Sequence, residues 1–158
     1  MTFEKKQEYT LKISQANKTQ MITIIYEMVM DYLDEAIDEI GMSRKEEARR
    51  CLINAQNCID ELIHSVNLNY ELGRNLHQIY IFSKKELTVA GITFSAHRIW
   101  RVKKNFKALH EAYVELEKQD KSENIMGNTQ KVYVGLTYGK YSLNEDMTGY
   151  AMNRGLMA

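Results

Sequence analysis

The chain has 158 residues, with 21 basic and 21 acidic side chains and a formal net charge of zero. This length fits one domain with a single core, and the neutral balance gives no support for binding to nucleic acid or to a membrane surface, because both need a basic excess. No apolar run is long enough to insert into a membrane, and the first residues lack the apolar centre of a signal peptide. We therefore expect a cytoplasmic protein.

The methionines and cysteines bear on partner binding and on the redox compartment. The nine methionines could line a surface that adapts to a variable partner, or they could fill gaps in an ordinary core. The two cysteines, Cys51 and Cys58, are too far apart for a CxxC redox site and poorly placed for a local disulfide. We predict that both are small buried side chains in a reducing compartment.

Residues 1–17 are polar with isolated apolar side chains at Phe3, Tyr9, Leu11 and Ile13. This pattern predicts an N-terminal arm that is partly helical. Asn17 followed by Gln20 resembles an N-cap whose glutamine side chain reaches back to the backbone. We therefore expect a long helix to begin after residue 17.

The first long helix is predicted over residues 18–40. Its apolar residues recur at steps of three and four, at Met21, Ile24, Ile25, Met28, Val29, Tyr32, Leu33, Ala36, Ile37 and Ile40. This stripe is wider than a two-position seam, so the helix is either central or carries an extra face for something else. Gly41 is expected to end it as a C-cap.

A second helix is predicted over residues 44–67, opened by a capping box of Ser43 and Glu46. Its apolar stripe runs through Ala48, Cys51 or Leu52, Ala55, Ile59, Leu62 or Ile63, and Val66. Nothing on this helix has the pattern of a catalytic site. It is an amphipathic surface that another element can pack against.

Two more amphipathic helices follow, over residues 70–90 and 95–120, and Gly91 is expected to close the first of them. The first has its core line at Leu72, Leu76, Ile79, Tyr80, Ser83, Leu87 and Ala90. The second has a coiled-coil-like seam at Ile99, Val102, Phe106, Leu109, Tyr113 and Leu116. Short links between four such helices predict an all-α protein, an antiparallel four-helix bundle over residues 18–122.

The composition changes after residue 122. Residues 127–158 hold five of the eight glycines and four of the ten tyrosines, without a helical period. Val132, Val134 and Leu136 alternate with other residues, which would allow a short strand. We predict a non-helical, extended or disordered tail over residues 123–158. Its apolar content suggests that it docks on the bundle or on a neighbouring protomer.

Catalytic motifs are missing from the sequence. It has no HExxH, P-loop, dinucleotide-binding glycine motif or nucleophile elbow. Glu61 and His64 have the Glu-x-x-His spacing of a di-iron bundle, but the second such motif that an oxidase needs is absent. We expect a protein that is not an enzyme, with no cofactor and no metal.

Surplus apolar residues favour an interaction protein. They occur at Met28 and Val29 on the first long helix and at Ile81 and Phe82 on the third. Exposed apolar patches on proteins of this kind usually mark a partner site. The arm and tail could instead cover these residues. The residues could also do both, if the arm covers the partner site until a partner displaces it.

Several segments resemble one known family, in the same order along the chain. Residues 54–56 (NAQ), Ile59, residues 61–62 (EL) and residues 65–67 (SVN) resemble the helix-2 signature of the flagellar export chaperone family FliS, KAQ..I.EL..SL. Residues 16–27, 72–80 and 109–113 are similar to three further stretches of that family. The resemblance spans about residues 9–120. Departures at residues 18–19, 27–28 and 80–82 point to a divergent branch with an altered partner preference.

The resemblance implies a chaperone that binds the C-terminal segment of flagellin, prevents its premature polymerisation and delivers it for secretion. The client would lay apolar anchors along the bundle, and the N-terminal arm would cover part of the groove until displaced. The expected partner-binding residues are Tyr9, Ile13, Met21, Ile24, Ile25, Met28, Leu76, Tyr80 and Leu87. Further partners would be the export apparatus or a regulatory flagellar protein. The alternative is a helical adaptor or regulator that binds another secreted or regulatory protein.

Overall fold

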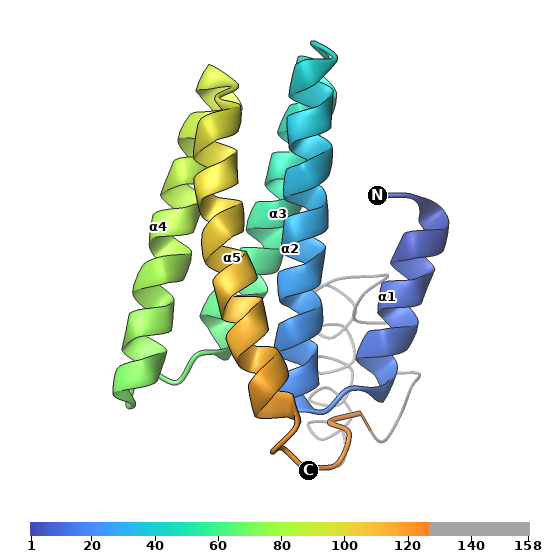
Figure 1. The fold of residues 1–158 in the computed structure, drawn as a ribbon, viewed down its shortest axis with the longest axis vertical. Helices are drawn as coiled ribbons and strands as arrows, with labels where there is room; N and C mark the ends of the chain where they lie inside the picture. The colour runs from blue at the N-terminus through green and yellow to red at the C-terminus, as the bar shows by residue number, and fades with distance from the viewer. Residues whose placement is uncertain (127–158) are drawn as a thin grey trace, which may run out of the picture.

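A computed structural model describes residues 1–126, and these contain five α-helices and no strand (Figure 1). The helices are α1 (Phe3–Gln15), α2 (Lys18–Gly41), α3 (Lys45–Ser65), α4 (Glu71–Thr93) and α5 (Ala96–Glu117). The predicted all-α class is confirmed. The predicted strand residues Val132, Val134 and Leu136, and most of the predicted tail, lie outside the described residues.

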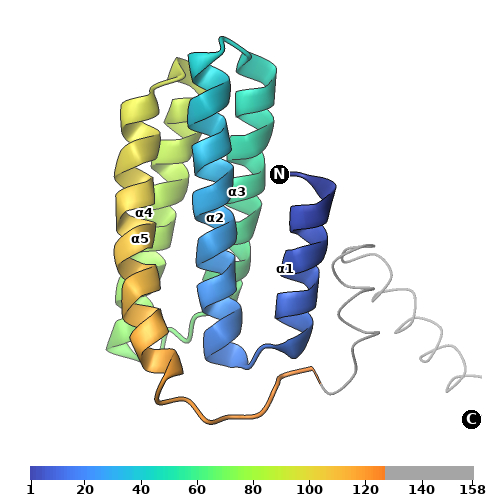
Figure 2. The same cartoon turned by 45° about the vertical axis from the view of Figure 1, so that its right-hand side comes forward.

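Helix α2 is the centre of the arrangement. It contacts α3, α5 and α1, while α3 also contacts α4 and α4 also contacts α5, so α2 to α5 form a closed ring. Figures 1 and 2 show these four helices side by side, with α1 outside the ring. Among the described helices, α1 contacts α2 alone. The wide apolar stripe of α2 is therefore explained both by its central position and by an extra face under α1.

An aromatic cluster fills the core between α2, α4 and α5. The Tyr26 ring lies edge-on to Phe106 and Tyr113, with centroids 5.6 and 5.3 Å apart. The hydroxyl oxygens of Tyr26 and Tyr80 are 2.5 Å apart. Burial raises the pKa of Tyr80 to about 12 and raises that of Tyr26 as well, so both phenols stay protonated and share a hydrogen bond. The buried hydroxyls therefore satisfy each other.

The structure confirms one of the two predicted capping boxes. The capping box at Asn17 is confirmed, because its side chain accepts the Gln20 N–H at 2.9 Å and the Gln20 side chain accepts the Asn17 N–H at 3.0 Å. The capping box at Ser43 is wrong: Ser43 has a φ of 61°, and α3 begins after Arg44 without a side-chain cap. A residue in the left-handed region belongs to the turn, where it cannot act as an N-cap with extended backbone.

Both predicted glycine helix ends are also wrong. Gly41 is still helical, and α4 continues past Gly91 to Thr93 before Phe94 takes a left-handed φ of 52°. The Phe94 ring lies 5.3 Å from the cationic groups of Lys45 and Arg49 on α3. Cation–π contacts with α3 therefore help to hold an aromatic residue in a conformation that usually favours glycine.

The N-terminal arm is more regular than expected, since α1 is a complete helix over Phe3–Gln15. The Thr2 hydroxyl accepts the Lys5 N–H at 3.3 Å and caps its first turn. Isolated helices of this length are marginal in water, so α1 depends on what it packs against.

Two glycines of α4 differ in how closely the helix backbone approaches its neighbours, and the pair provides a matched test of that approach. A Cβ on Gly73 would lie 2.0 Å from the Asn67 carbonyl oxygen, whereas a Cβ on Gly91 would meet only the Leu52 side chain, at 3.8 Å. We expect Gly73→Ala to lower the free energy of unfolding by about 2 kcal/mol or more, because the backbone must shift. Gly91→Ala should raise it by about 0.5–1 kcal/mol through helix propensity. Urea unfolding followed by circular dichroism measures both, and equal effects would contradict the close approach at Gly73.

Candidate partner-binding site

Helix α1 covers a small apolar cluster separate from the main core, which we call the α1–α2 seam. Its buried residues are Tyr9, Ile13, Ala16 and Ile24, and the side chains of Met1, Met21, Met28 and Met126 pack against them. The seam is therefore rich in methionine, the most adaptable apolar side chain. Figure 2 shows α1 alongside α2, away from α4 and α5.

Helical spacing explains how one helix serves two apolar clusters. Met21, Ile24 and Met28 follow one another at steps of three and four, so they share a face of α2. Tyr26 and Val29 point from the same helix into the main core and are fully buried. The prediction that Val29 is surplus to the core is therefore wrong, whereas Met28 does lie in the seam.

A row of polar contacts runs along the edge of the seam. The acids Glu27, Asp31 and Glu35 are four residues apart on α2 and therefore share one side of the helix. They pair in antiparallel order with α1 and its N-terminus: the Met1 amino group with Glu35, Lys5 with Asp31 at 2.8 Å, and Lys12 with Glu27 at 3.6 Å.

These ion pairs orient α1 more than they stabilise it. The Lys5 and Lys12 side chains are each 44% exposed, and such pairs contribute about 0–1 kcal/mol. Apolar contact in the seam supplies most of the attraction, and the ion pairs select the register and direction of α1 on α2.

Tyr9 links the apolar and polar parts of the seam. Its ring is buried, and its hydroxyl donates a hydrogen bond to the Asp31 carboxylate. Burial and the neighbouring Asp31 carboxylate raise the pKa of Tyr9 well above its usual range, so the phenol remains a donor at any physiological pH.

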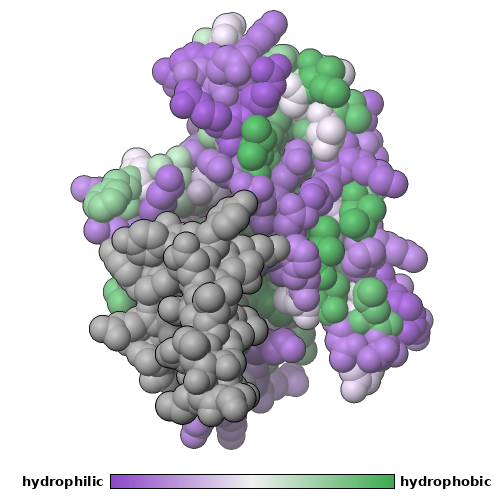
Figure 3. Space-filling model, turned by 180° about the vertical axis from the view of Figure 1, so that it is seen from behind, coloured by the Kyte–Doolittle hydropathy of each residue, from purple (hydrophilic) through white to green (hydrophobic). Residues whose placement is uncertain are grey.

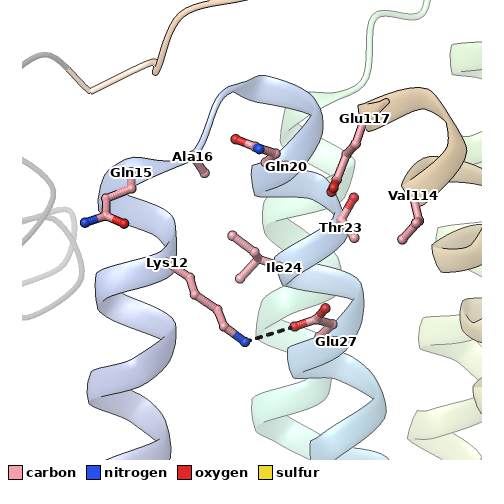
Figure 4. Close-up of a pocket in the computed structure, with 9 residues that line it drawn as sticks. All are labelled: Lys12, Gln15, Ala16, Gln20, Thr23, Ile24, Glu27, Val114 and Glu117. Atoms are coloured by element: carbon pink, nitrogen blue, oxygen red, sulfur yellow. Dashed lines mark ion pairs between the residues drawn. The ribbon is translucent and has the colours of Figure 1, made fainter. Parts of the chain in front are cut away.

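A groove of about 370 Å³ lies beside the seam, between α1, α2 and the end of α5 (Figure 4). It is lined by Lys12, Gln15, Ala16, Gln20, Thr23, Ile24, Glu27, Val114 and Glu117. Glu27 lies between Lys12 of α1 and His110 of α5, whose Nε2 is 3.2 Å from Glu27 Oε1. Polar groups beside the Ile24 side chain suit a peptide better than a purely apolar ligand.

Five of the nine predicted binding residues come together in the seam: Tyr9, Ile13, Met21, Ile24 and Met28. The other four belong to the main core, where Leu76, Tyr80 and Leu87 are buried and Ile25 is half-buried. A partner would reach those four only if the core rearranged, so their role in binding stays a prediction.

Sequence reasoning missed the row of acids on α2. The signal was present, because Glu27, Asp31 and Glu35 recur every four residues and the arm carries lysines at positions 5 and 12. The pairing could not be read from either segment alone, since it depends on α1 folding back against α2.

Apolar side chains are also exposed on α4. Phe82 is 41% exposed, Val89 is 36% exposed and Ile92 is 73% exposed, while Ile81 is half-buried. Figure 3, seen from behind, shows apolar groups scattered among polar ones on the side where α4 lies. The predicted surplus at Phe82 is thus a surface feature of the structure.

The cysteines are half-buried rather than buried, and both are free thiols. Burial raises the pKa of Cys58 to about 12, and burial beside Glu35 also raises that of Cys51. Both thiols are therefore protonated at neutral pH and poor nucleophiles.

No group of three histidine, cysteine or acidic side chains within residues 1–126 is arranged to hold a metal ion. None of the helices in that range is long and apolar enough to span a membrane.

The fold and the seam define a class: an all-helical protein whose N-terminal helix covers an apolar face of the central helix. A family model described as "Flagellar protein FliS" matches residues 2–120, a range that includes all five helices. The chain therefore belongs to the FliS family of flagellar export chaperones. A comparison with curated proteins found no match.

The hydroxyl of Tyr9 can be tested apart from its ring. Tyr9→Phe keeps the apolar contact and removes the hydrogen bond to Asp31, which should weaken the docking of α1 by about 1 kcal/mol. Amide hydrogen exchange over residues 3–15 should then be about fivefold faster, with α3 unchanged. The exposed Leu11→Ala serves as a control on the same helix. Exchange at the original rate in Tyr9→Phe would mean that the hydroxyl does not help to hold α1.

Proposed function

We propose that this protein is a cytoplasmic chaperone that binds the C-terminal segment of flagellin, prevents its premature polymerisation and delivers it to the export apparatus. Membership of the FliS family supports the role in flagellar export. The observation that carries the finer proposal is the α1–α2 seam, an apolar face covered by a helix that contacts only one of the other helices within residues 1–126.

The proposed binding step is an exchange of one helix for another. When α1 leaves, Met21, Ile24 and Met28 become available to a client helix with apolar side chains at steps of three and four. The client must offset the loss of α1 as well as its own ordering, so it needs a longer apolar contact than α1 makes. The flexible methionines allow the face to fit a different set of side chains.

The scaffold in this proposal is α2 to α5, taken as an antiparallel four-helix bundle. Its main core does not include Tyr9 or Ile13, the buried apolar residues of α1. Loss of α1 should therefore leave the bundle folded. This separation lets the chaperone open its site without unfolding, at a free-energy cost limited to one small cluster.

Direct binding to flagellin tests the proposal. The full chain should form a 1:1 complex with the C-terminal segment of a flagellin from the same organism, as measured by co-purification and calorimetry. A flagellin that lacks this segment is the matched control. A well-folded chain that fails to bind the segment would contradict the proposal.

The same substitution on the two sides of the seam should have opposite effects. Ile24→Asp places a charge on the binding face of α2 and should weaken client binding at least tenfold. Ile13→Asp should instead release the cover and strengthen binding, because less of the α1 contact must be broken. Titration calorimetry measures both affinities.

Ile53→Asp on α3, where the side chain is already 49% exposed, controls for added surface charge and should leave the affinity unchanged. If Ile13→Asp and Ile24→Asp both weaken binding, α1 contacts the client and does not act as a removable cover.

A helical adaptor for another secreted or regulatory protein is the second candidate. The partly exposed Phe82 and Val89 and the largely exposed Ile92 on α4 favour it. A client that binds this face would lose affinity on Phe82→Asp and would be indifferent to Ile24→Asp.

A further inference from the structure

After the end of α5, the chain continues along the surface of the helical bundle. Figure 2 shows the segment after α5 running beneath the lower ends of α2 and α1. We call residues 120–126 the strap. The family model stops matching at residue 120, so nearly all of the strap lies beyond the part of the chain that the family describes.

Three hydrogen bonds join the strap to the N-terminal side of α2: one to its first turn, and two to the short link between α1 and α2. The Thr19 hydroxyl donates to the Asp120 carboxylate, and the Asn17 side-chain amide donates to the Ser122 carbonyl at 3.5 Å. The Ile125 N–H donates to the Ala16 carbonyl oxygen at 3.2 Å. Met126 then packs against the seam itself.

The strap contacts the place where α1 must pivot. Only Ala16 and Asn17 separate the two helices, and both have extended backbone. They are 2% and 5% exposed, which is unusual for a short link at the end of a helical bundle. A buried pivot with a hydrogen-bonded carbonyl cannot rotate freely, because rotation would expose Ala16 and break the bond from Ile125.

Two residues make the strap a continuous unit with α2. Asn17 caps α2 through its side-chain oxygen and holds Ser122 through its side-chain nitrogen. Asp120 accepts the Ser122 N–H at 2.9 Å as well as the Thr19 hydroxyl. These bonds from Ser122 and Thr19 hold the pKa of Asp120 below its usual range, so it is a carboxylate at neutral pH.

We propose that the strap retains α1 over the α1–α2 seam, so that the seam opens only after residues 120–126 release the link at Ala16 and Asn17. The surface formed by this link and the adjoining seam is thus a docking site for residues 120–126 of the same chain. Any effect of the strap on client binding rests on the proposed function. The retention of α1 can be tested without a client, because it is a property of the unbound chain.

A matched pair of variants at one position tests the proposal in the full chain. Ile125→Pro removes the N–H that bonds to Ala16, whereas Ile125→Ala keeps it, and the side chain is already 50% exposed. In Ile125→Pro we expect amide exchange over residues 3–15 to be about fivefold faster, with α3 unchanged. Ile125→Ala should exchange at the original rate.

A second variant guards against a disturbance specific to proline. Asp120→Ala removes the acceptor for Thr19 and Ser122 and should give the same selective acceleration in α1. If α1 exchanges at the original rate in both Ile125→Pro and Asp120→Ala, the strap does not retain it and the proposal is overturned. Acceleration of α3 to the same extent would also overturn it, because the strap would then stabilise the whole bundle.

Client binding then separates this inference from the proposed function. If flagellin binds, Ile125→Pro should raise its affinity about threefold to fivefold relative to Ile125→Ala. An unchanged affinity would overturn the coupling between strap and site. If flagellin does not bind at all, the proposed function fails while the exchange experiment still decides whether the strap retains α1.

Discussion

Helix α2 must bury two apolar faces at once, and the rest of the structure follows from this constraint. One face, with Tyr26, Val29 and Leu33, lies in the main core against α3 and α5. The other, at Ile24 with its neighbouring methionines, has no place in that core and is covered by α1. A helix with a single apolar stripe would have needed no cover. The second face is therefore what the proposed exchange of α1 for a client would expose.

The main core and the α1–α2 seam differ in the extent of their packing. The main core has fully buried aromatic and aliphatic side chains from four helices, and the hydroxyls of Tyr26 and Tyr80 are paired. The seam has four buried residues, a rim of methionines and a row of partly exposed ion pairs. Low contact density is the physical basis for local opening without global unfolding. The structure thus combines a densely packed scaffold with an N-terminal helix held by one small cluster.

Polar contacts give the cover its direction. The acids at positions 27, 31 and 35 match the N-terminus, Lys5 and Lys12 in only one antiparallel register. Tyr9 adds a hydrogen bond to Asp31 within the same register. Such contacts contribute little net free energy at the surface but disfavour shifted or reversed arrangements. A client helix would meet the same acidic edge, so basic residues beside its apolar stripe would suit this site.

The sequence by itself determined the helical class, the four long amphipathic segments and the Asn17 cap, because periodicity and capping are local properties. It also determined the membership of the family, because the family's motifs occur in order along the chain. It also singled out Tyr9, Ile13, Met21, Ile24 and Met28 as partner-binding residues, and the structure brings these five together in the seam. Only the tertiary structure decided that Leu76, Tyr80 and Leu87 lie in the core, since spacing defines a face but not its exposure. The helix end at Phe94 and the strap across Ala16 depend on contacts between segments far apart in the chain, where local signals carry no information.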